Sequence, residues 1–577
     1  MSLPTGSPRP LVAEPITTSP PGGSSEPSRQ RVVGSQTLAD ITRRSAGRYP
    51  GKTALIDGAV RVTFAELDHL VDATAAAIQA EGLVKGDVVA VLSRNCWQLA
   101  VLPFAAARAG VILAPINFLL SPSEVAAILR LAKPKAFIAE EHLIDTAQAA
   151  LDQIKADSSA AHPNAADPDA SDRPAGEPTT APGDFNAITR LGIGPDKRAA
   201  RHGWRDLDEW LNHPGRPTPA PLADHDIVRL MFTSGTEAGA KAVQLTSRSL
   251  MWQYISTIVS GGAAVEDVDL QFMPFYHCAQ LDVFLIPDIY LGATSVVLRS
   301  AGPGPIMRAI EEHGVNKMFA TPSKWIELLH SPAFDPDRLK GLTKGYYGAS
   351  AMPVPVLREL AEKLPNLRLW NFYGQTEMSP AACILPPEDQ LEFAGSAGQP
   401  ALNVEMAILD PASRELGPGQ VGEIAFRSPH ACAGYLDDPE GTERLFRDGW
   451  LHTGDQGYRS DAGRLYFVDR VKDTVNVGGE KVASREVEEI IYQMPQVQEA
   501  AVIGVPDPRF VEAVAAVVVP RPGAALTPDE VIAFTRHHLA RFKTPKFVVL
   551  AETLPKNASG KILKRELRAQ HSALALD

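Results

Sequence analysis

Cysteine is scarce in this chain, with 4 residues among 577. They are Cys96, Cys278, Cys383 and Cys432, and no two of them form a Cys-x-x-Cys pair. This spacing excludes the common zinc-binding patterns and offers no framework of disulfides. We therefore expect buried thiols and a cytoplasmic protein, because the cytoplasm keeps thiols reduced.

Long apolar runs are lacking as well. The best candidate, residues 99–113, is interrupted by Pro103 and Arg108, and it falls short of the roughly 18 residues that a membrane-spanning helix needs. We expect no transmembrane segment, which still leaves peripheral contact with a membrane open. Residues 1–35 are rich in proline, serine and glycine and lack the apolar core of a signal peptide, so we expect a disordered tail there.

Positive charge is outnumbered in this sequence. It has 56 Lys and Arg residues against 68 Asp and Glu residues, for a formal net charge of -12. Nucleic-acid binding relies on clustered positive charge, so we expect no nucleic-acid partner. The length exceeds what one hydrophobic core supports, and it predicts two or three folded units.

Helix and strand patterns alternate from residue 37 onward. Thr63 and Glu66 form a capping box ahead of a helical pattern, and Ser121 and Glu124 repeat that signal. Between these two helices, residues 87–92 and 110–116 are typical of buried strands and residues 97–107 of a helix; residues 502–507 and 514–519 again read as strands. The alternation predicts an α/β fold with parallel-rich sheets layered with helices.

Residues 156–200 interrupt this alternation. Ala, Pro, Asp and Ser dominate the segment, and large apolar side chains are almost absent between residues 162 and 184. We expect an exposed insertion here. Its Gly192-Ile193-Gly194 stretch is not a dinucleotide-binding fingerprint, because we expect no strand to lead into it.

The stretch Thr233-Ser234-Gly235-Thr236-Glu237-Ala238-Gly239-Ala240-Lys241 has the composition of a polyphosphate-binding loop. A strand pattern precedes it at residues 227–232 and a helix pattern follows at residues 249–259, so backbone N–H groups and hydroxyls would surround an anion. It is not a Walker A loop, because Gly239 and Lys241 are not adjacent and Ala242 follows.

The Thr-Ser-Gly-Thr start of this loop resembles the signature of the acyl-adenylate-forming superfamily of acyl-CoA synthetases, peptide-synthetase adenylation domains and luciferases. Later motifs follow in the family's order, and the resemblance covers roughly residues 36–570. They are Pro274-x-x-His277, Gly348-Ala349-Ser350, Tyr373-Gly374-Gln375-Thr376-Glu377, Asp455, Arg470, Gly478-Gly479 and the terminal Ser559-Gly560-Lys561. The loop departs from the family's Thr-Gly-x-Pro-Lys-Gly continuation at Glu237, Ala238, Ala240 and Ala242.

The resemblance implies a role for each matched residue. Lys561 would be the adenylation lysine, His277 would gate the acid's access to the nucleotide, and Glu377 with Thr236 would hold magnesium. The residues implied to contact ATP are Thr233, Ser234, Gly235, Lys241, Gly348, Ala349, Ser350, Asn371, Phe372, Tyr373, Gly374, Gln375, Thr376, Asp455, Phe467 and Arg470. Lys472 would be the hinge, and Gly478, Gly479 and Glu480 would line the CoA arm.

The same resemblance implies a large N-terminal AMP-binding domain, residues 36–469, and a small mobile α+β domain, residues 470–577, that carries the catalytic lysine. The implied reaction is ATP- and magnesium-dependent adenylation of an acid, followed by transfer to CoA. Transfer to an amine or a carrier-protein thiol is an alternative, and so is a nucleotide-binding relative without catalysis. A homodimer is left open.

The acid is expected to be apolar, most simply a medium- or long-chain fatty acid, with an aryl acid as the alternative. By family position its pocket would be lined by Trp252, Ile255, Leu281, Phe284 and Tyr347. In the amino-acid-adenylating relatives an Asp receives the substrate ammonium group, and Ala279 takes that place here. An unpaired ammonium would be costly there, so amino acids should be poor substrates.

Overall fold

The computed structural model describes residues 36–161, 185, 187–194, 198–218, 220, 222–234, 240–299, 302–350, 352–470, 473–477, 480–507, 511–557, 560–572 and 574. The chain divides into Met1–Gln36 and a compact unit, Thr37–Asp577, and only the second is described below. The expected disordered tail, residues 1–35, lies outside the described residues. So do Gly235, Thr236, Lys472, Gly478 and Gly479.

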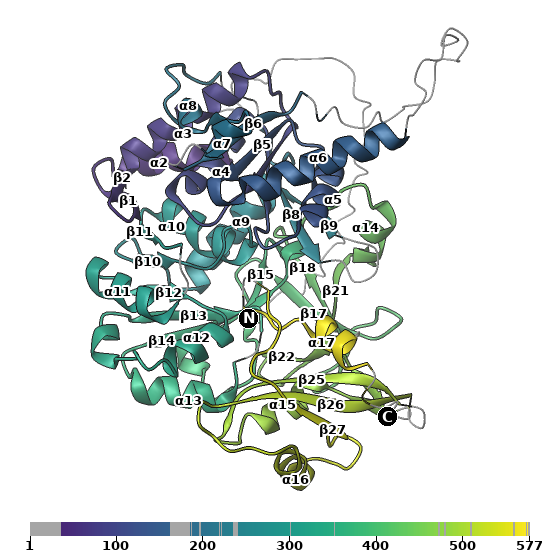
Figure 1. Ribbon diagram of the computed structural model, residues 1–577. Coiled ribbons are helices and arrows are strands. Elements are labelled where there is room, and N and C mark those ends of the chain that lie inside the picture. Colours follow the sequence, from purple (N-terminus) through teal and green to yellow (C-terminus); the bar gives the residue numbers. More distant parts are fainter. Residues whose placement is uncertain are drawn as a thin grey trace, which may run out of the picture. The chain divides into compact units, whose positions relative to one another are not determined.

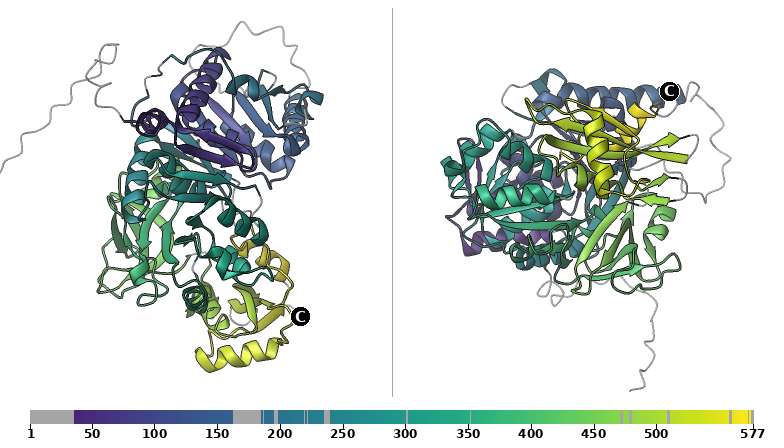
Figure 2. Two further views of the ribbon diagram at one scale, coloured as in Figure 1. Left: turned by 90° about the vertical axis from the view of Figure 1, so that its left-hand side faces the viewer. Right: turned by 90° about the horizontal axis from the view of Figure 1, so that it is seen from below.

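An eight-stranded sheet, parallel from β8 through β7, is covered by helices on both faces (Figures 1 and 2). Its spatial order is β19 (Gly434–Tyr435), β9 (Ala240–Thr246), β8 (Ile227–Ser234), β4 (Ile112–Ile116), β3 (Val88–Leu92), β5 (Ala136–Glu140), β6 (Thr189–Ile193) and β7 (Arg205–Asp206). Val89 and Val91 pack in one core with α3 (Phe64–Ala80) and α4 (Trp97–Ala109). Ala90 and Leu92 pack in another with α5 (Pro122–Ala132) and α6 (Ile144–Ala161), as the alternation of a buried strand requires.

A nine-stranded sheet forms the second layer, and its strands from β1 to β14 run parallel. Its order is β16 (Gln399–Pro400), β15 (Ala381–Leu385), β14 (Arg368–Gly374), β13 (Lys344–Gly348), β12 (Lys317–Phe319), β10 (Val268–Gln271), β11 (Thr294–Val297), β1 (Thr53–Asp57) and β2 (Val60–Thr63). The helical elements of this part are α9 (Ser247–Ser260), a π-helix (Ala279–Leu285), α10 (Ile286–Leu291), α11 (Pro303–His313), α12 (Pro322–Leu329) and α13 (Val354–Lys363). Shorter helices are α2 (Ile41–Arg48), α7 (Arg198–Arg201) and α8 (Asp208–Leu211).

Two five-stranded sheets complete the chain. The first contains β17 (Glu405–Leu409), β18 (Gly422–Arg427), β20 (Phe446–Arg447), β21 (Trp450–Arg459) and β22 (Leu465–Arg470), with α14 (Pro439–Leu445) between its strands. The second contains β23 (Val475–Val477), β24 (Glu480–Val482), β25 (Val497–Asp507), β26 (Val511–Pro520) and β27 (Phe547–Leu550). Helices α15 (Ser484–Ile491), α16 (Pro528–His538) and α17 (Lys564–His571) pack on it, which gives this part the expected α+β character.

The strand expected at residues 227–232 and the helix expected at residues 249–259 are present as β8 and α9, but the expectation that the phosphate loop leads directly into the helix is wrong. The loop joins two antiparallel strands, because Thr233 of β8 pairs with Lys241 of β9, and helix α9 begins only at Ser247. Ala242, Val243 and Leu245 are buried, and β9 also pairs with β19, so residues 240–246 are held as a strand on both edges. Strand β9 therefore stands between the loop and helix α9.

The expected insertion at residues 156–200 is also wrong in part. Helix α6 runs through residue 161, and β6 pairs in parallel with β5 while Leu191 and Ile193 are buried. A strand therefore does lead into Gly192, where an added Cβ would lie 2.2 Å from the Cβ of Ala199. Packing accounts for this glycine, and residues 162–184 lie outside the described ranges.

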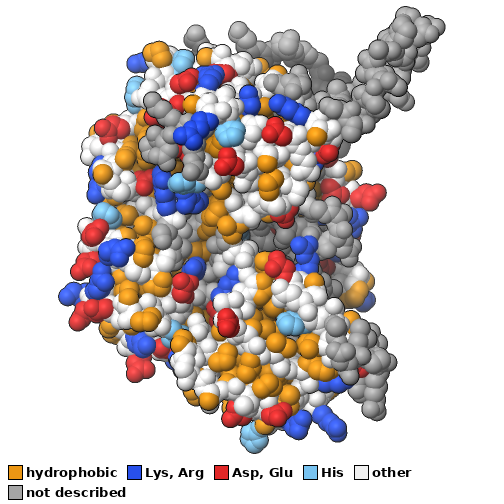
Figure 3. Space-filling view, viewed as in Figure 1, with side chains coloured by type: hydrophobic (Ala, Val, Ile, Leu, Met, Phe, Trp, Pro, Cys, Tyr) orange, Lys and Arg blue, Asp and Glu red, His pale blue; other side chains and the backbone are white. Residues whose placement is uncertain are grey.

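The buried thiols, the surface charges and the helices bear on three expectations drawn from the composition. All four cysteines are free and buried, as expected. On the face shown in Figure 3, Lys and Arg side chains are interspersed with Asp and Glu. Within the described ranges, every helix is too short or too polar to cross a lipid bilayer.

Candidate active site

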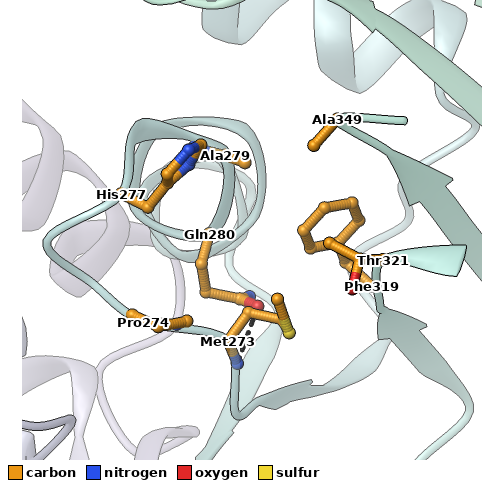
Figure 4. Close-up of a pocket in the computed structure, with 8 residues that line it drawn as sticks. All are labelled: Met273, Pro274, His277, Ala279, Gln280, Phe319, Thr321 and Ala349. Carbon is orange, nitrogen blue, oxygen red and sulfur yellow. Dashed lines mark hydrogen bonds between the residues drawn. The ribbon is translucent and has the colours of Figure 1, made fainter. Parts of the chain in front are cut away.

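A small cavity marks the candidate active site (Figure 4). Its lining residues are Met273, Pro274, His277, Ala279, Gln280, Phe319, Thr321 and Ala349. The Pro-x-x-His motif and the small-residue motif, far apart in the sequence, therefore meet here through His277 and Ala349. The space open to a water-sized group is about 10 Å³, which is room for about one water molecule.

His277 presents a neutral ring to this cavity. Its Nδ1 accepts a hydrogen bond of 3.1 Å from the backbone N–H of Ala279, so the ring proton of the neutral form sits on Nε2. Burial, and after it the positive charge of Lys561, lowers the pKa of His277 to about 4. His277 is therefore a hydrogen-bond donor and not a cation at neutral pH, and Lys561 is near enough to influence it.

The loop that carries Lys561 is tightly turned. The N–H of Lys561 donates to Oδ1 of Asn557 at 2.9 Å, and the N–H of Asn557 donates to the Lys561 carbonyl at 2.9 Å. Gly560 has φ +81°, in the left-handed region that favours glycine. A Cβ on Gly560 would lie 2.8 Å from Oγ1 of Thr321, so glycine allows this loop to approach the cavity wall.

Two of the motifs expected to contact ATP, at residues 348–350 and 371–377, are adjacent because β13 and β14 pair in parallel. Gly348 lies beside Phe372 in this register, and a Cβ on Gly348 would be 2.5 Å from the Phe372 carbonyl oxygen. Ala349 follows with φ 64°, an uncommon value that turns the backbone out of the sheet beside the cavity. Asn371 is fixed by a 3.0 Å hydrogen bond from Nδ2 to the Ser396 carbonyl. The exposed Ser350 completes this edge.

Two more residues expected to contact ATP, Asp455 and Phe467, lie around Tyr373. Its hydroxyl donates to Oδ2 of Asp455 at 2.8 Å, and its ring centroid is 6.1 Å from that of Phe467. Asp455 pairs through the backbone with Arg470, whose side chain lies outside the described part of the chain. Nε2 of Gln375 is buried without a hydrogen-bond partner in the described structure, so a donor is spare for a nucleotide.

Glu377 and Lys241 are linked by a residue that the sequence interpretation missed. The hydroxyl of Tyr435 donates to Oε1 of Glu377 at 2.7 Å, and Nζ of Lys241 lies 4.4 Å from the centre of the Tyr435 ring. Lys241 also forms an ion pair of 3.1 Å with Asp438, the N-cap residue of α14. Oγ1 of Thr376 is 3.4 Å from Sγ of Cys278, which brings the Glu377 motif next to the His277 segment.

Glu377 is suited to magnesium, which proteins commonly bind through one or two carboxylates together with substrate phosphates. The hydrogen bond from Tyr435 holds this carboxylate in one orientation through Oε1. Within the described ranges, no three or more His, Cys, Asp and Glu side chains converge on a common point. The side chain of Ser234, Gly235 and the second expected ligand, Thr236, lie outside those ranges.

The side chains expected to line the acid pocket are not among those of this cavity, which has room for only about one water molecule, so that expectation stays a prediction. Trp252 is 40 % exposed on α9, and neither it, Ile255, Leu281, Phe284 nor Tyr347 lines the cavity. Phe284 is buried and stacks on Phe319 with ring centroids 4.7 Å apart. The segment from Ala279 to Leu285 is a π-helix, whose turn is wider than the α-helical one.

Ala279, which takes the place of the ammonium-binding Asp, does line the cavity, together with Gln280 and Ala349. Met273, Phe319 and Thr321 were missed. Thr321-Pro322 is a helix-start signal, and it is the one local cue that marks this corner in the sequence. Glu480, expected near CoA, is exposed at the start of β24.

Comparison with known proteins gives the family. Residues 42–436 match the family described as AMP-binding enzyme, and residues 486–561 match the AMP-binding enzyme C-terminal domain. A feruloyl-CoA synthase of Amycolatopsis is 31% identical over 92% of this chain and 99% of its own length. A long-chain-fatty-acid–CoA ligase of Bacillus subtilis is 32% identical over 92% of this chain and 94% of its own. The ATP-bound structure of MatB from Rhodopseudomonas palustris aligns with a TM-score of 0.80 at 25% identity, covering 93% of this chain and 99% of that one.

The predicted resemblance, the α/β fold class and the enzyme class, an AMP-forming acid–thiol ligase, are confirmed. The family match spans more than half of the chain and extends through both expected parts. The chain belongs to the family of AMP-binding enzymes.

Proposed function

We propose that this enzyme activates a carboxylic acid with ATP to an acyl-adenylate and then transfers the acyl group to CoA, releasing AMP and pyrophosphate. ATP and CoA are its co-substrates, as in the acyl-CoA ligases that it resembles. One observation carries the proposal. A Cβ on Gly560 of the terminal motif would lie 2.8 Å from Oγ1 of Thr321, in the wall of a cavity that His277 and Ala349 also line, and the charge of Lys561 helps to lower the pKa of His277.

The first step brings a carboxylate up to the α-phosphorus of a polyanion, so it needs positive charge and oriented donors. Lys561 supplies a charge at the cavity, and neutral His277 supplies an Nε2–H donor without adding charge. Lys241 would hold the departing pyrophosphate together with the hydroxyls of the loop. A magnesium ion on Glu377 would offset phosphate charge when bound.

The second step is attack of the CoA thiolate on the acyl-adenylate. We propose that residues 470–577 then turn about Lys472 relative to residues 36–469, so that Gly478 and Gly479 replace Lys561 at the reaction centre. Oδ2 of Asp469 accepts hydrogen bonds from the N–H and the hydroxyl of Ser484 at 2.7 and 2.9 Å. This contact next to the hinge supports one defined orientation of residues 470–577 before the turn.

For the acid, we propose a medium- or long-chain fatty acid, in line with the similarity to a long-chain-fatty-acid–CoA ligase. The cavity wall supports an apolar substrate, since Met273, Pro274, Phe319 and Ala349 line it. An aryl acid is the second candidate. The similarity to a feruloyl-CoA synthase favours it, and so does Phe319, which is stacked on Phe284 and could stack on an aromatic ring in the same way.

A substrate panel tests this proposal. Linear fatty acids, benzoates, cinnamates, dicarboxylates and amino acids are each incubated with ATP and magnesium, with CoA, with a small primary amine, or with neither. Pyrophosphate release and the acylated product are both measured. We expect thioester with fatty acids, whereas turnover of aryl acids alone would select the second candidate. Amide without thioester would contradict CoA as acceptor, and turnover of amino acids or dicarboxylates alone would contradict the apolar substrate.

We also propose a cytoplasmic location, which the four free thiols support because such thiols persist in a reducing compartment. Fractionation of cells that produce the native chain tests this, and recovery in a secreted fraction would contradict it. Light scattering of the purified enzyme, alone and with lipid vesicles, gives its oligomeric state and tests for peripheral membrane contact.

A further inference from the structure

One buried hydroxyl in the cavity has nothing to bind. Oγ1 of Thr321 is enclosed, with the residue 1% exposed, and it has no hydrogen-bond partner in the described structure. Leaving a buried hydroxyl unpaired is costly, and buried polar groups in proteins are nearly always satisfied. The exceptions call for a reason, and a ligand is one such reason.

Local structure offers Thr321 a partner that its side chain does not use. Thr321 is the N-cap residue of α12, a position where a threonine hydroxyl ordinarily accepts from the backbone N–H two or three residues on. Here it makes no such bond, and the N–H groups of Lys324 and Trp325 bind the Thr321 carbonyl instead, at 2.9 and 3.0 Å. The side chain of Thr321, a residue of the cavity wall, therefore leaves the helix start without a side-chain cap.

The hydroxyl faces the groups that handle the acid. Figure 4 shows Thr321 across the cavity from His277, whose Nε2 carries the proton of the neutral ring. The turn that carries Lys561 lies on the same side as Thr321, because a Cβ on Gly560 would lie 2.8 Å from Oγ1. Thr321 and His277 thus lie in the wall of one small cavity, and Lys561 is close enough to His277 to influence its pKa.

We propose that Thr321 is a substrate-contacting residue, whose hydroxyl donates a hydrogen bond to the carboxylate of the acid during adenylation. A carboxylate has about four lone-pair sites, so it accepts from Thr321 while it also meets His277 and Lys561. Binding of the acid then satisfies the group that folding leaves unpaired. This inference rests on the proposed function.

Three variants test the proposal. Thr321→Val keeps the shape and removes the hydroxyl, and Thr321→Ser keeps the hydroxyl. Thr74→Val is the stability control, because the Thr74 hydroxyl is buried but donates to the Leu70 carbonyl at 2.7 Å. The measurements are acid-dependent exchange of pyrophosphate into ATP with the best acid of the panel, thioester formation from supplied acyl-adenylate, and thermal unfolding without substrates.

For Thr321→Val we expect kcat/KM for the acid in the exchange reaction to fall roughly 10- to 100-fold, the range for a hydrogen bond to a charged group. The KM for ATP and the thioester half-reaction should be unchanged, and Thr321→Ser should retain most of the exchange activity. Thr321→Val should unfold at a temperature no lower than wild type, since it removes an unpaired polar group, whereas Thr74→Val should unfold at a lower one.

Exchange by Thr321→Val at the wild-type rate would overturn the inference and leave the proposed function intact. Equal losses in both half-reactions, together with a lower unfolding temperature, would also overturn it by showing a structural role. A wild-type enzyme that exchanges pyrophosphate with no acid would contradict the proposed function itself, and the unfolding comparison would then still test whether the hydroxyl is unpaired.

Discussion

The hydroxyl of Tyr435 donates a hydrogen bond of 2.7 Å to Oε1 of Glu377. The same ring lies 4.4 Å from Nζ of Lys241, so one tyrosine contacts both the residue expected to bind magnesium and the one expected to bind pyrophosphate. Tyr435 comes from β19, which pairs with β9 just beyond Lys241. The pairing of these strands therefore sets the distance between the two sites.

Tyr435→Phe should weaken magnesium binding while the ring and its contact with Lys241 remain. Without the hydroxyl, the Glu377 carboxylate loses the bond that orients it, which is worth about tenfold for a charged acceptor. We therefore expect the magnesium concentration for half-maximal adenylation to rise about tenfold. The check is a magnesium titration of pyrophosphate exchange.

The matched control is Tyr458→Phe, in the stacked pair of Tyr458 with Tyr466. It should leave the titration unchanged. If Tyr435→Phe gave the wild-type titration as well, Tyr435 would not position Glu377.

Gly560→Ala should impair adenylation for two reasons. The residue has φ +81°, and its Cβ would lie 2.8 Å from Oγ1 of Thr321. We expect the rate of adenylation to fall at least about tenfold, because a small displacement of a catalytic group is costly, while thioester formation from supplied acyl-adenylate is spared.

Gly523→Ala is the control that separates the effect of backbone strain from the effect of the clash with Thr321. Gly523 lies in the same C-terminal part with φ +77°, and an added Cβ there meets nothing within 4 Å. Both variants carry the backbone strain, and only Gly560→Ala also carries the clash. Equal activities of the two variants would show that the approach of Gly560 to Thr321 does not matter.

Stability should decrease with acidification because of His430. Burial lowers its pKa from 6.5 to about 4, and its Nδ1 is 3.1 Å from the Ala381 carbonyl. The folded state therefore stays neutral where the unfolded state binds a proton, so this stability is present above 6.5 and is lost as the pH falls toward 4. His430 should account for about 2 kcal/mol of unfolding free energy lost between about pH 7 and about pH 5.

Urea unfolding of wild type and His430→Asn at these two pH values measures that contribution. The variant is less stable at neutral pH, and its unfolding free energy should change less between the two conditions. An identical change in both proteins would mean that His430 takes up a proton in the folded state as readily as in the unfolded one.

Local signals predicted much of the fold. The capping box is present as expected: Thr63 Oγ1 accepts from Glu66, and Glu66 accepts from the Thr63 N–H at 2.8 Å. The strand pattern at residues 87–92 became β3 (Val88–Leu92). Where the prediction was wrong, pairing with distant strands decided the outcome. β9 is held by β8 and β19, and β6 by β5, so their short apolar stretches were hard to recognise alone.

The candidate site shows the same division. Family motifs led to His277 and Lys561, and the structure places them near each other. Thr321 and Tyr435 could not be found in this way, because what distinguishes them is contact with Gly560 and Glu377, which are far away in the sequence. An unused helix cap and an unpaired hydroxyl are visible only once the chain is folded.

The central claim is that the enzyme adenylates a carboxylic acid with ATP and that the charge of Lys561 stabilises the reacting anions. Its most direct test is acid-dependent exchange of pyrophosphate into ATP by wild type and Lys561→Ala, measured beside thioester formation from supplied acyl-adenylate. Losing a charge that stabilises the reacting anion typically costs on the order of 100-fold or more. We predict a loss of that size in the exchange reaction and an intact thioester half-reaction, whereas equal losses in both, or none, would contradict the assignment.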